Sequence, residues 1–126
     1  MIVGIGTDIV RIDRFEAMLE RHGPRVAERI LDADELTEFA AAARPARFLA
    51  KRFAVKEAVA KAFGTGFRDG LSLRHIGLTH DALGRPSLVF SGRAEELRVR
   101  LGVADSHVSV ADERDYAIAF VTLLRG

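Results

Sequence analysis

The fold of this chain is decided by one stretch, Phe48-Leu-Ala-Lys-Arg-Phe-Ala-Val-Lys-Glu57-Ala-Val-Ala-Lys61-Ala-Phe-Gly64-Thr-Gly66. The stretch predicts a long helix, because alanine has the highest helix propensity and recurs throughout it. Large apolar residues form a stripe along it: Leu49, Phe53, Val59 and Phe63. Gly64 and Gly66 suit the positive φ that a helix C-terminus needs, so the helix is expected to end there.

Glu57 and Lys61 are the polar pair of this helix. They lie one turn apart with the acid first, which places both side chains on the same face. We expect Lys51, Arg52 and Lys56 to surround this pair with positive charge. A single acid in a basic helix is typical of a metal ligand in a phosphate site, and a surface ion pair fits the spacing equally well.

Length and composition indicate one globular domain. The 126 residues suit a single domain spanning residues 1–126, and 48% apolar with 29% charged residues is ordinary for such a domain. Cysteine is absent, which excludes disulfides, thiol nucleophiles and zinc–thiolate sites.

Charge and hydropathy limit the classes of partner. A net charge of +1 argues against bulk affinity for nucleic acid. No apolar run approaches the roughly 18 residues of a membrane-spanning helix, and acids and arginines from Asp8 onward interrupt any signal peptide. We therefore expect a cytoplasmic protein that binds neither membrane nor nucleic acid.

The N-terminal segment 1–11 is predicted to be a strand, because branched apolar residues dominate it. Glycine inside a strand suggests close approach of another backbone, so Gly4 and Gly6 mark a packing contact. Asp8 follows near the end of the strand. From the residues alone, a hydrogen bond to local backbone or an ion pair with an arginine is the favoured role for Asp8.

The remaining pattern predicts an α+β fold, in which an antiparallel sheet carries a long central helix and shorter helices. Asp13 is the expected N-cap of a helix ending at His22, and Asp32 or Asp34 the expected N-cap of a helix running to Ala43. Pro45 suits the first turn of the central helix. Further elements are expected at strands 71–78 and 88–89, a turn 81–86, a helix 92–101, and strands 107–111 and 116–124.

Most catalytic chemistries find no support in the sequence. There is no Gly-x-Ser-x-Gly elbow and no Walker motif, and the histidines are not closely paired. Carboxylates are therefore the better candidates for metal ligands. Two acids among basic neighbours match Mg²⁺, which takes one or two carboxylates and fills its shell with water and phosphate oxygens.

Two motifs resemble the signatures of the 4′-phosphopantetheinyl transferases: Gly4-Ile-Gly-Thr-Asp8-Ile-Val, and Arg52-Phe-Ala-Val-Lys-Glu57-Ala-Val-Ala-Lys61-Ala-Phe-Gly-Thr-Gly66. The chain length, His107-Val-Ser and Tyr116-Ala-Ile-Ala resemble the short bacterial type. This resemblance covers nearly the whole chain and favours a functional role for Asp8 and for the Glu57–Lys61 pair.

The resemblance implies transfer of 4′-phosphopantetheine from coenzyme A to a serine hydroxyl of apo acyl carrier protein, in support of fatty acid biosynthesis. It implies that Asp8 and Glu57 are Mg²⁺ ligands and that Lys61 contacts the pyrophosphate. It also implies that Glu57 is the base, either directly or through a metal-bound water. Arg52 and Gly64 match family positions near coenzyme A. Gly84 and Pro86 resemble a turn that lies against the adenine, although a plain hairpin is about as well supported.

Partners also follow from the resemblance. Arg14, Met18 and Arg21 match positions that contact the acidic carrier protein in relatives, and the short type forms homotrimers with active sites between subunits. One position departs from the pattern, because Asp112 stands where many relatives have histidine. No role of that histidine is carried to this chain.

Two other functions are compatible with parts of the sequence. A relative that has lost catalysis would bind carrier protein or nucleotide without adding mass to the carrier protein. A nucleic-acid-binding domain would use the basic central helix and would bind in a salt-dependent way. The presence of Asp8, Glu57 and Lys61 together favours the enzyme.

Overall fold

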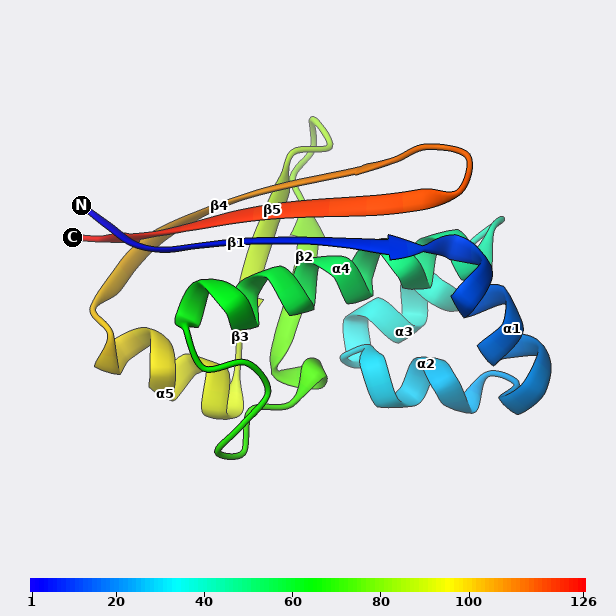
Figure 1. The fold of residues 1–126 in the computed structure, drawn as a ribbon, viewed down its shortest axis with the longest axis horizontal. Helices are drawn as coiled ribbons and strands as arrows, with labels where there is room; N and C mark the ends of the chain where they lie inside the picture. The colour runs from blue at the N-terminus through cyan, green and yellow to red at the C-terminus, as the bar shows by residue number, and fades with distance from the viewer.

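The structure is a computed structural model that describes all residues, 1–126. Its centre is one long helix, which a three-stranded sheet covers on one side and shorter helices and a separate hairpin cover elsewhere (Figure 1). The elements are β1 (Ile2–Arg11), α1 (Ile12–His22), α2 (Arg25–Ile30), α3 (Ala33–Ala40), α4 (Pro45–Phe63), a 3₁₀ turn (Leu73–His75), β2 (Ile76–His80), β3 (Pro86–Phe90), α5 (Gly92–Arg100), β4 (Val103–Asp112) and β5 (Tyr116–Arg125). The predicted α+β class is confirmed.

The three-stranded sheet has the order β1-β5-β4, and both of its pairings are antiparallel. The first and last strands of the chain are therefore neighbours, and the two termini lie side by side (Figure 1). One face of β5 is buried on α4 and has small or branched side chains: Ala117, Ala119, Val121 and Leu123. The other face carries exposed apolar side chains.

Helix α4 begins and ends where the sequence predicts. Pro45 occupies its first turn, and Gly64 follows its last residue with a φ of 83°. Most of the helix is buried, because the sheet, α1, α2 and β2 all pack against it. The predicted apolar stripe is thus part of a wider buried surface.

Several local predictions are wrong in detail. The prediction of one sheet is corrected to two, because β2 and β3 pair only with each other. Asp13 does not cap α1. The Ile12 amide bonds to the Asp115 carbonyl and starts the helix earlier, while Asp13 pairs with Arg11. Asp32, and not Asp34, caps α3.

The boundaries of two further elements also differ from the prediction. Helix α3 ends at Ala40 because the Ala41 and Ala42 amides bond to carbonyls three residues back, which tightens the last turn. Leu71 and Leu73 lie before β2, and Leu73 belongs to the 3₁₀ turn. No helix in the structure combines the length and apolar character that a bilayer span requires.

Gly6 provides a test of how tightly β1 packs on α4. A Cβ at this position would lie 1.8 Å from the Ala58 carbonyl oxygen, so Gly6→Ala forces two backbones apart. We expect a loss of about 3 kcal/mol in the free energy of unfolding, measured with urea. The control Ser109→Ala, at an exposed position of β4, should change it by less than about 0.5 kcal/mol. Equal effects of the two substitutions would contradict this packing.

Candidate active site

Asp8 reaches its position because β1 lies directly on the backbone of α4. A Cβ on Gly4 or on Gly6 would come within 1.8 Å of a carbonyl oxygen of the helix, that of Ala62 or Ala58. Only glycine permits this approach. The predicted backbone contact is therefore confirmed, and it brings Asp8 to the helix turn that carries Glu57 and Lys61.

Lys61 bridges the two elements. Its ammonium group donates hydrogen bonds to Asp8 Oδ1 at 2.9 Å and to the Thr7 carbonyl oxygen at 3.0 Å. The Asp8 side chain is only 14% exposed, whereas that of Lys61 is 52% exposed. Asp8 Oδ2 is buried and has no hydrogen-bond partner, although a buried carboxylate oxygen normally has one.

Glu57 lies close enough to Asp8 for their charges to interact. Burial raises the pKa of the Glu57 carboxyl, and the negative charge of Asp8 raises it further. Lys61 and Arg14 act in the opposite direction on the same pKa. Two carboxylates on adjacent elements thus repel each other at neutral pH, with one ammonium group between the strand and the helix.

These residues fit a divalent cation. The unpartnered Asp8 Oδ2 offers a free acceptor, and the mutual repulsion of Asp8 and Glu57 would be relieved by positive charge. Oxygen donors of this kind match a hard ion such as Mg²⁺, which needs few protein ligands. Asp8 and Glu57 are the residues that would hold it.

Arg52 lies on α4 but does not join this cluster. Its side chain is buried, and it pairs with Glu35 Oε2 and Glu38 Oε2 at 3.2 Å and stacks over the Phe48 ring at 4.4 Å. Lys56 is fully buried and pairs with Glu35 at 2.6 Å. The basic residues of α4 therefore do not surround Glu57, contrary to our interpretation of the sequence.

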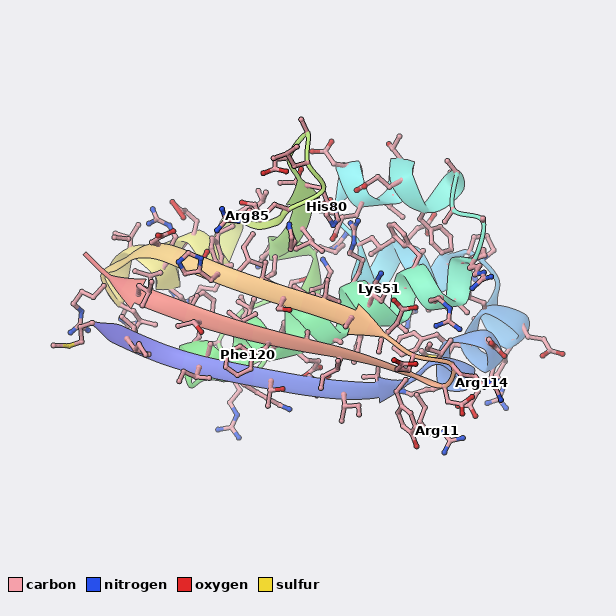
Figure 2. The ribbon with its side chains drawn as sticks, turned by 90° about the horizontal axis from the view of Figure 1, so that it is seen from above. Arg11, Lys51, His80, Arg85, Arg114 and Phe120 are labelled. Atoms are coloured by element: carbon pink, nitrogen blue, oxygen red, sulfur yellow. The ribbon has the colours of Figure 1, made fainter.

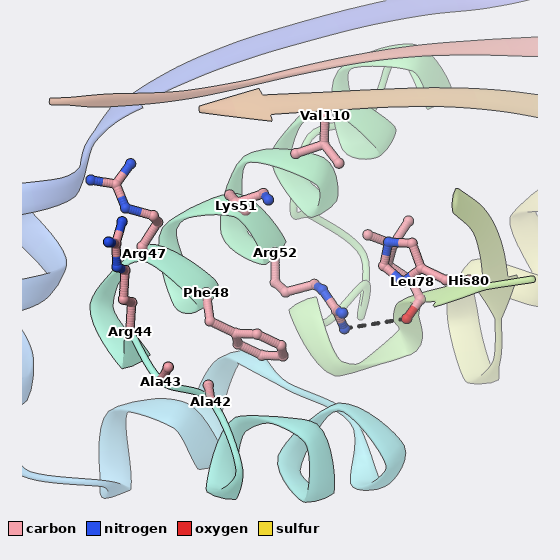
Figure 3. Close-up of a pocket in the computed structure, with 10 residues that line it drawn as sticks. All are labelled: Ala42, Ala43, Arg44, Arg47, Phe48, Lys51, Arg52, Leu78, His80 and Val110. Carbon is pink, nitrogen blue, oxygen red and sulfur yellow. Dashed lines mark hydrogen bonds between the residues drawn. The ribbon is translucent and has the colours of Figure 1, made fainter. Parts of the chain in front are cut away.

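A separate hollow lies between the first half of α4 and the edge of β2. It has a volume of about 370 Å³, and most of its polar side chains are basic (Figure 3). Its lining is Ala42, Ala43, Arg44, Arg47, Phe48, Lys51, Arg52, Leu78, His80 and Val110. We call this hollow the basic pocket.

Asp112 fixes two of the basic side chains at this pocket. Its carboxylate pairs with Arg47 at 2.7 Å and with Lys51 at 3.3 Å. The Arg47 guanidinium beside it lowers the pKa of Asp112, and Lys51 adds to the shift. Asp112 thus joins the end of β4 to α4.

The predicted turn before β3 lies beyond the β4 edge of the three-stranded sheet, whereas Asp8 lies on β1 at the opposite edge. Gly84 has a φ of 84° in a turn closed by Asp81, and Pro86 starts β3. Figure 2 shows neighbouring Arg85 and His80 on the β4 side, whereas β1 forms the opposite edge. Within one chain, the structure brings Asp8, Glu57 and Lys61 together and keeps this turn apart from them. Gly64 ends α4 beyond Ala62, which lies against Gly4, and therefore does not join the cluster at Asp8.

The proposed docking residues lie along α1. Met18 and Arg21 line a hollow of about 600 Å³ whose other walls include His22, Arg25 and Arg29. Arg14 lies over the rings of Phe15 and Phe53, at 5.5 and 5.2 Å, and its charge acts on Glu57. The basic face of α1 thus runs from this hollow toward the carboxylate pair.

Comparison with known proteins identifies the family of this chain. A family model described as the 4′-phosphopantetheinyl transferase superfamily matches residues 4–121. The chain belongs to this superfamily. A holo-[acyl-carrier-protein] synthase of Halorhodospira halophila is 55% identical over the full length of both chains.

Solved structures of transferases from this family share the fold over the whole chain. The holo-[acyl-carrier-protein] synthase of Neisseria meningitidis has a TM-score of 0.94 and 44% identity, covering 99% of this chain and 100% of the other. The Bacillus anthracis synthase, solved with coenzyme A (3′,5′-ADP), has a TM-score of 0.83 and 34% identity, covering 100% and 99%. The predicted family and fold are confirmed.

Sequence reasoning missed one buried residue of this transferase, Glu35. The carboxylate is 1% exposed and binds side chains of α4 and backbone of β2. The spacing of Asp32 and Glu35 is that of a capping box, and the structure shows both of its hydrogen bonds. That signal identifies Glu35 as a helix-capping residue, but it does not reveal the cations that share its carboxylate.

The raised pKa of Glu57 predicts a stability difference between the wild type and Glu57→Gln. The Glu57 carboxyl loses its proton less readily in the folded state than in the unfolded state, so its ionisation lowers the free energy of unfolding. The wild type therefore becomes less stable as the pH rises through the folded-state pKa of Glu57. With chelator present, Glu57→Gln should melt about 2–4 °C higher at pH 7. The difference should vanish near pH 4, where glutamate is largely protonated.

Thermal melts of both proteins from pH 4 to pH 8 measure this difference. Glu20→Gln, on the exposed side of α1, is the matched control and should follow the wild type. A melting temperature of Glu57→Gln at or below that of the wild type at pH 7 would contradict the repulsion between Glu57 and Asp8.

Proposed function

We propose that this chain transfers the 4′-phosphopantetheine group of coenzyme A to a serine hydroxyl of apo acyl carrier protein, with Mg²⁺ as cofactor. The products are holo acyl carrier protein and adenosine 3′,5′-bisphosphate. The observation that carries this proposal is the cluster of Asp8, Glu57 and Lys61, which joins the two family motifs across β1 and α4. In this proposal the reaction serves fatty acid biosynthesis in the cytoplasm.

The chemistry requires a base and a means to stabilise negative charge. The serine oxygen forms a bond to the phosphorus on the pantetheine side of the pyrophosphate, and the bridging oxygen leaves with the nucleotide. Glu57 accepts the serine proton, which its raised pKa favours. The Lys61 side chain is half exposed, and its ammonium keeps a third donor beside its bonds to Asp8 and Thr7 with which to stabilise the leaving phosphate. A bound Mg²⁺ would neutralise the pyrophosphate oxygens.

The basic pocket is the site we propose for the nucleotide part of coenzyme A. It offers an aromatic ring, Phe48, and the guanidinium of Arg44 at the start of α4. Arg52 lines it too, so its predicted contact with coenzyme A remains compatible with its buried ion pairs. The turn at Gly84 and Pro86 continues the β2 side of this pocket toward the adenine.

The carrier protein is proposed to dock on the basic face of α1. Met18 offers an adaptable apolar contact, while Arg14 and Arg21 attract acidic side chains. Arg14 is also near enough to Glu57 to affect its pKa. A carrier protein bound to this face would therefore hold its serine beside the carboxylate pair.

We also propose that the chain assembles as a homotrimer through the outer face of its three-stranded sheet. Apolar side chains are exposed there: Ile5, Ile9, Tyr116, Ile118 and Phe120. A contiguous apolar face of this kind is unusual for a monomer. Within one chain, the basic pocket lies toward the β4 edge of the sheet and the acids lie toward the β1 edge. Assembly would bring the basic pocket of one subunit to the acids of another. The number of subunits rests on the resemblance to the short bacterial type.

A nucleic-acid-binding function is less well supported. Arg52 and Lys56 are buried against acids, and Arg47 and Lys51 are paired with Asp112. Few of the basic residues on α4 therefore remain free to contact phosphates of a nucleic-acid backbone.

Mass spectrometry of the carrier protein tests the transfer directly. With coenzyme A and Mg²⁺, we expect the carrier protein to gain the mass of phosphopantetheine, and chelation should abolish the gain. Asp8→Ala and Glu57→Ala should each lower the rate by at least about 100-fold, since each removes a proposed metal ligand. The control Glu96→Ala, on exposed α5, should retain the activity. Full activity of Asp8→Ala or Glu57→Ala would refute the proposed roles.

Phe120→Asp tests the assembly. Phe120 is 48% exposed on the outer face of β5, so the folded subunit should tolerate the change while the apolar contact is lost. We expect light scattering to show a trimer for the wild type and a smaller species for the variant, with transfer reduced at least about tenfold. Val99→Asp, exposed on α5, is the control. A trimeric, fully active Phe120→Asp protein would contradict this interface.

A further inference from the structure

The free edge of β2 is bonded to side chains and not to another strand. In an antiparallel pair, alternate residues direct their backbone groups to opposite neighbours. Ile76 and Leu78 direct theirs away from β3, and side chains of α3 and α4 meet them. Glu35 accepts from the Leu78 amide and Arg52 donates to the Leu78 carbonyl, both at 3.2 Å. Lys56 donates to the Ile76 carbonyl.

Glu35 is the hub of this arrangement. Its Oε1 accepts from Lys56 Nζ at 2.6 Å and from the Asp32 amide at 3.0 Å. Its Oε2 accepts from Arg52 and from the Leu78 amide, both at 3.2 Å. One carboxylate therefore connects α3, α4 and β2. Because its charge lies between two buried cations, no neutral side chain of the same shape can replace all of its bonds.

The same β2 edge is one wall of the basic pocket. Leu78 and His80 line the pocket from β2, while Arg52 and Phe48 line it from α4 (Figure 3). The Arg52–Leu78 hydrogen bond drawn there crosses from one wall to the other. Beyond His80, the strand leads into the turn with Gly84 and Pro86. The spacing of the two walls therefore depends on the bonds that Glu35 organises.

We propose that Glu35 is a positioning residue for coenzyme A: it fixes the β2–β3 hairpin against α4 and thereby sets the width of the nucleotide pocket. The inference rests on the proposed function. Glu35 is buried and touches neither Asp8 nor Glu57, so its contribution is to binding of the nucleotide and not to the chemical step.

The kinetic test compares Glu35→Gln with Glu38→Gln. Glu38 is the matched control, because it also pairs with Arg52 but is 46% exposed and makes no bond to β2. For Glu35→Gln we expect the KM for coenzyme A to rise about tenfold while kcat stays within about threefold, whereas Glu38→Gln should change both by less than about twofold. An unchanged KM, or a fall in kcat alone, would overturn the positioning role.

A measurement on the wild type covers the case in which Glu35→Gln does not fold. If the hydrogen bonds that Glu35 organises favour nucleotide binding, bound nucleotide must in turn stabilise those hydrogen bonds. Saturating adenosine 3′,5′-bisphosphate should therefore slow hydrogen exchange of the Leu78 amide at least about tenfold. The Ala104 amide, at the distant end of β4, is the internal reference.

The outcomes separate this inference from the proposed function. Nucleotide that binds, as calorimetry would show, without slowing exchange at Leu78 overturns the inference alone. A wild-type protein that binds neither adenosine 3′,5′-bisphosphate nor coenzyme A overturns the proposed function, and the inference with it.

Discussion

The contact between the backbones of β1 and α4 is the constraint on which the rest of this structure depends. Gly4 and Gly6 let the strand lie directly on carbonyl groups of the helix, where any side chain would collide. Asp8, two residues beyond Gly6, then meets the last turns of α4 with its backbone held in the sheet by β5. Asp8 therefore reaches Lys61 from a fixed strand and not from a flexible loop. The packing of β1 on α4 sets the position of the Asp8–Lys61 pair.

Helix α4 serves two polar clusters because consecutive residues on a helix point about 100° apart. Arg52 and Lys56 share one face and meet Glu35, while Glu57 and Lys61 share another and meet Asp8. Lys56 and Glu57 are neighbours in sequence but belong to different clusters. One buried helix thus fixes the relative positions of the carboxylate pair and the wall of the basic pocket.

The features that could be predicted from the sequence are those that depend on residues close together along the chain. The glycines of β1, the start of α4 at Pro45 and its end at Gly64 follow from backbone chemistry within a few residues. The resemblance added the meeting of Asp8 with Glu57. Glu35 was not found, because the cations that it binds lie 17 and 21 positions away and are brought to it only by tertiary packing. For the same reason the sequence did not show that Arg52 and Lys56 turn away from Glu57 and pair with buried acids.

The two polar clusters also differ in how much water reaches them, and this difference separates their roles. Around Glu35, buried cations and backbone groups satisfy both carboxylate oxygens, so this carboxylate has no capacity left for a ligand. Around Asp8, one carboxylate oxygen lacks a partner and the Lys61 side chain remains half exposed. Charges with all their hydrogen bonds made stabilise one arrangement of the chain, whereas a buried carboxylate oxygen without a partner favours the binding of a cation. On that physical ground the Asp8 cluster is suited to chemistry and the Glu35 cluster to holding the pocket in shape.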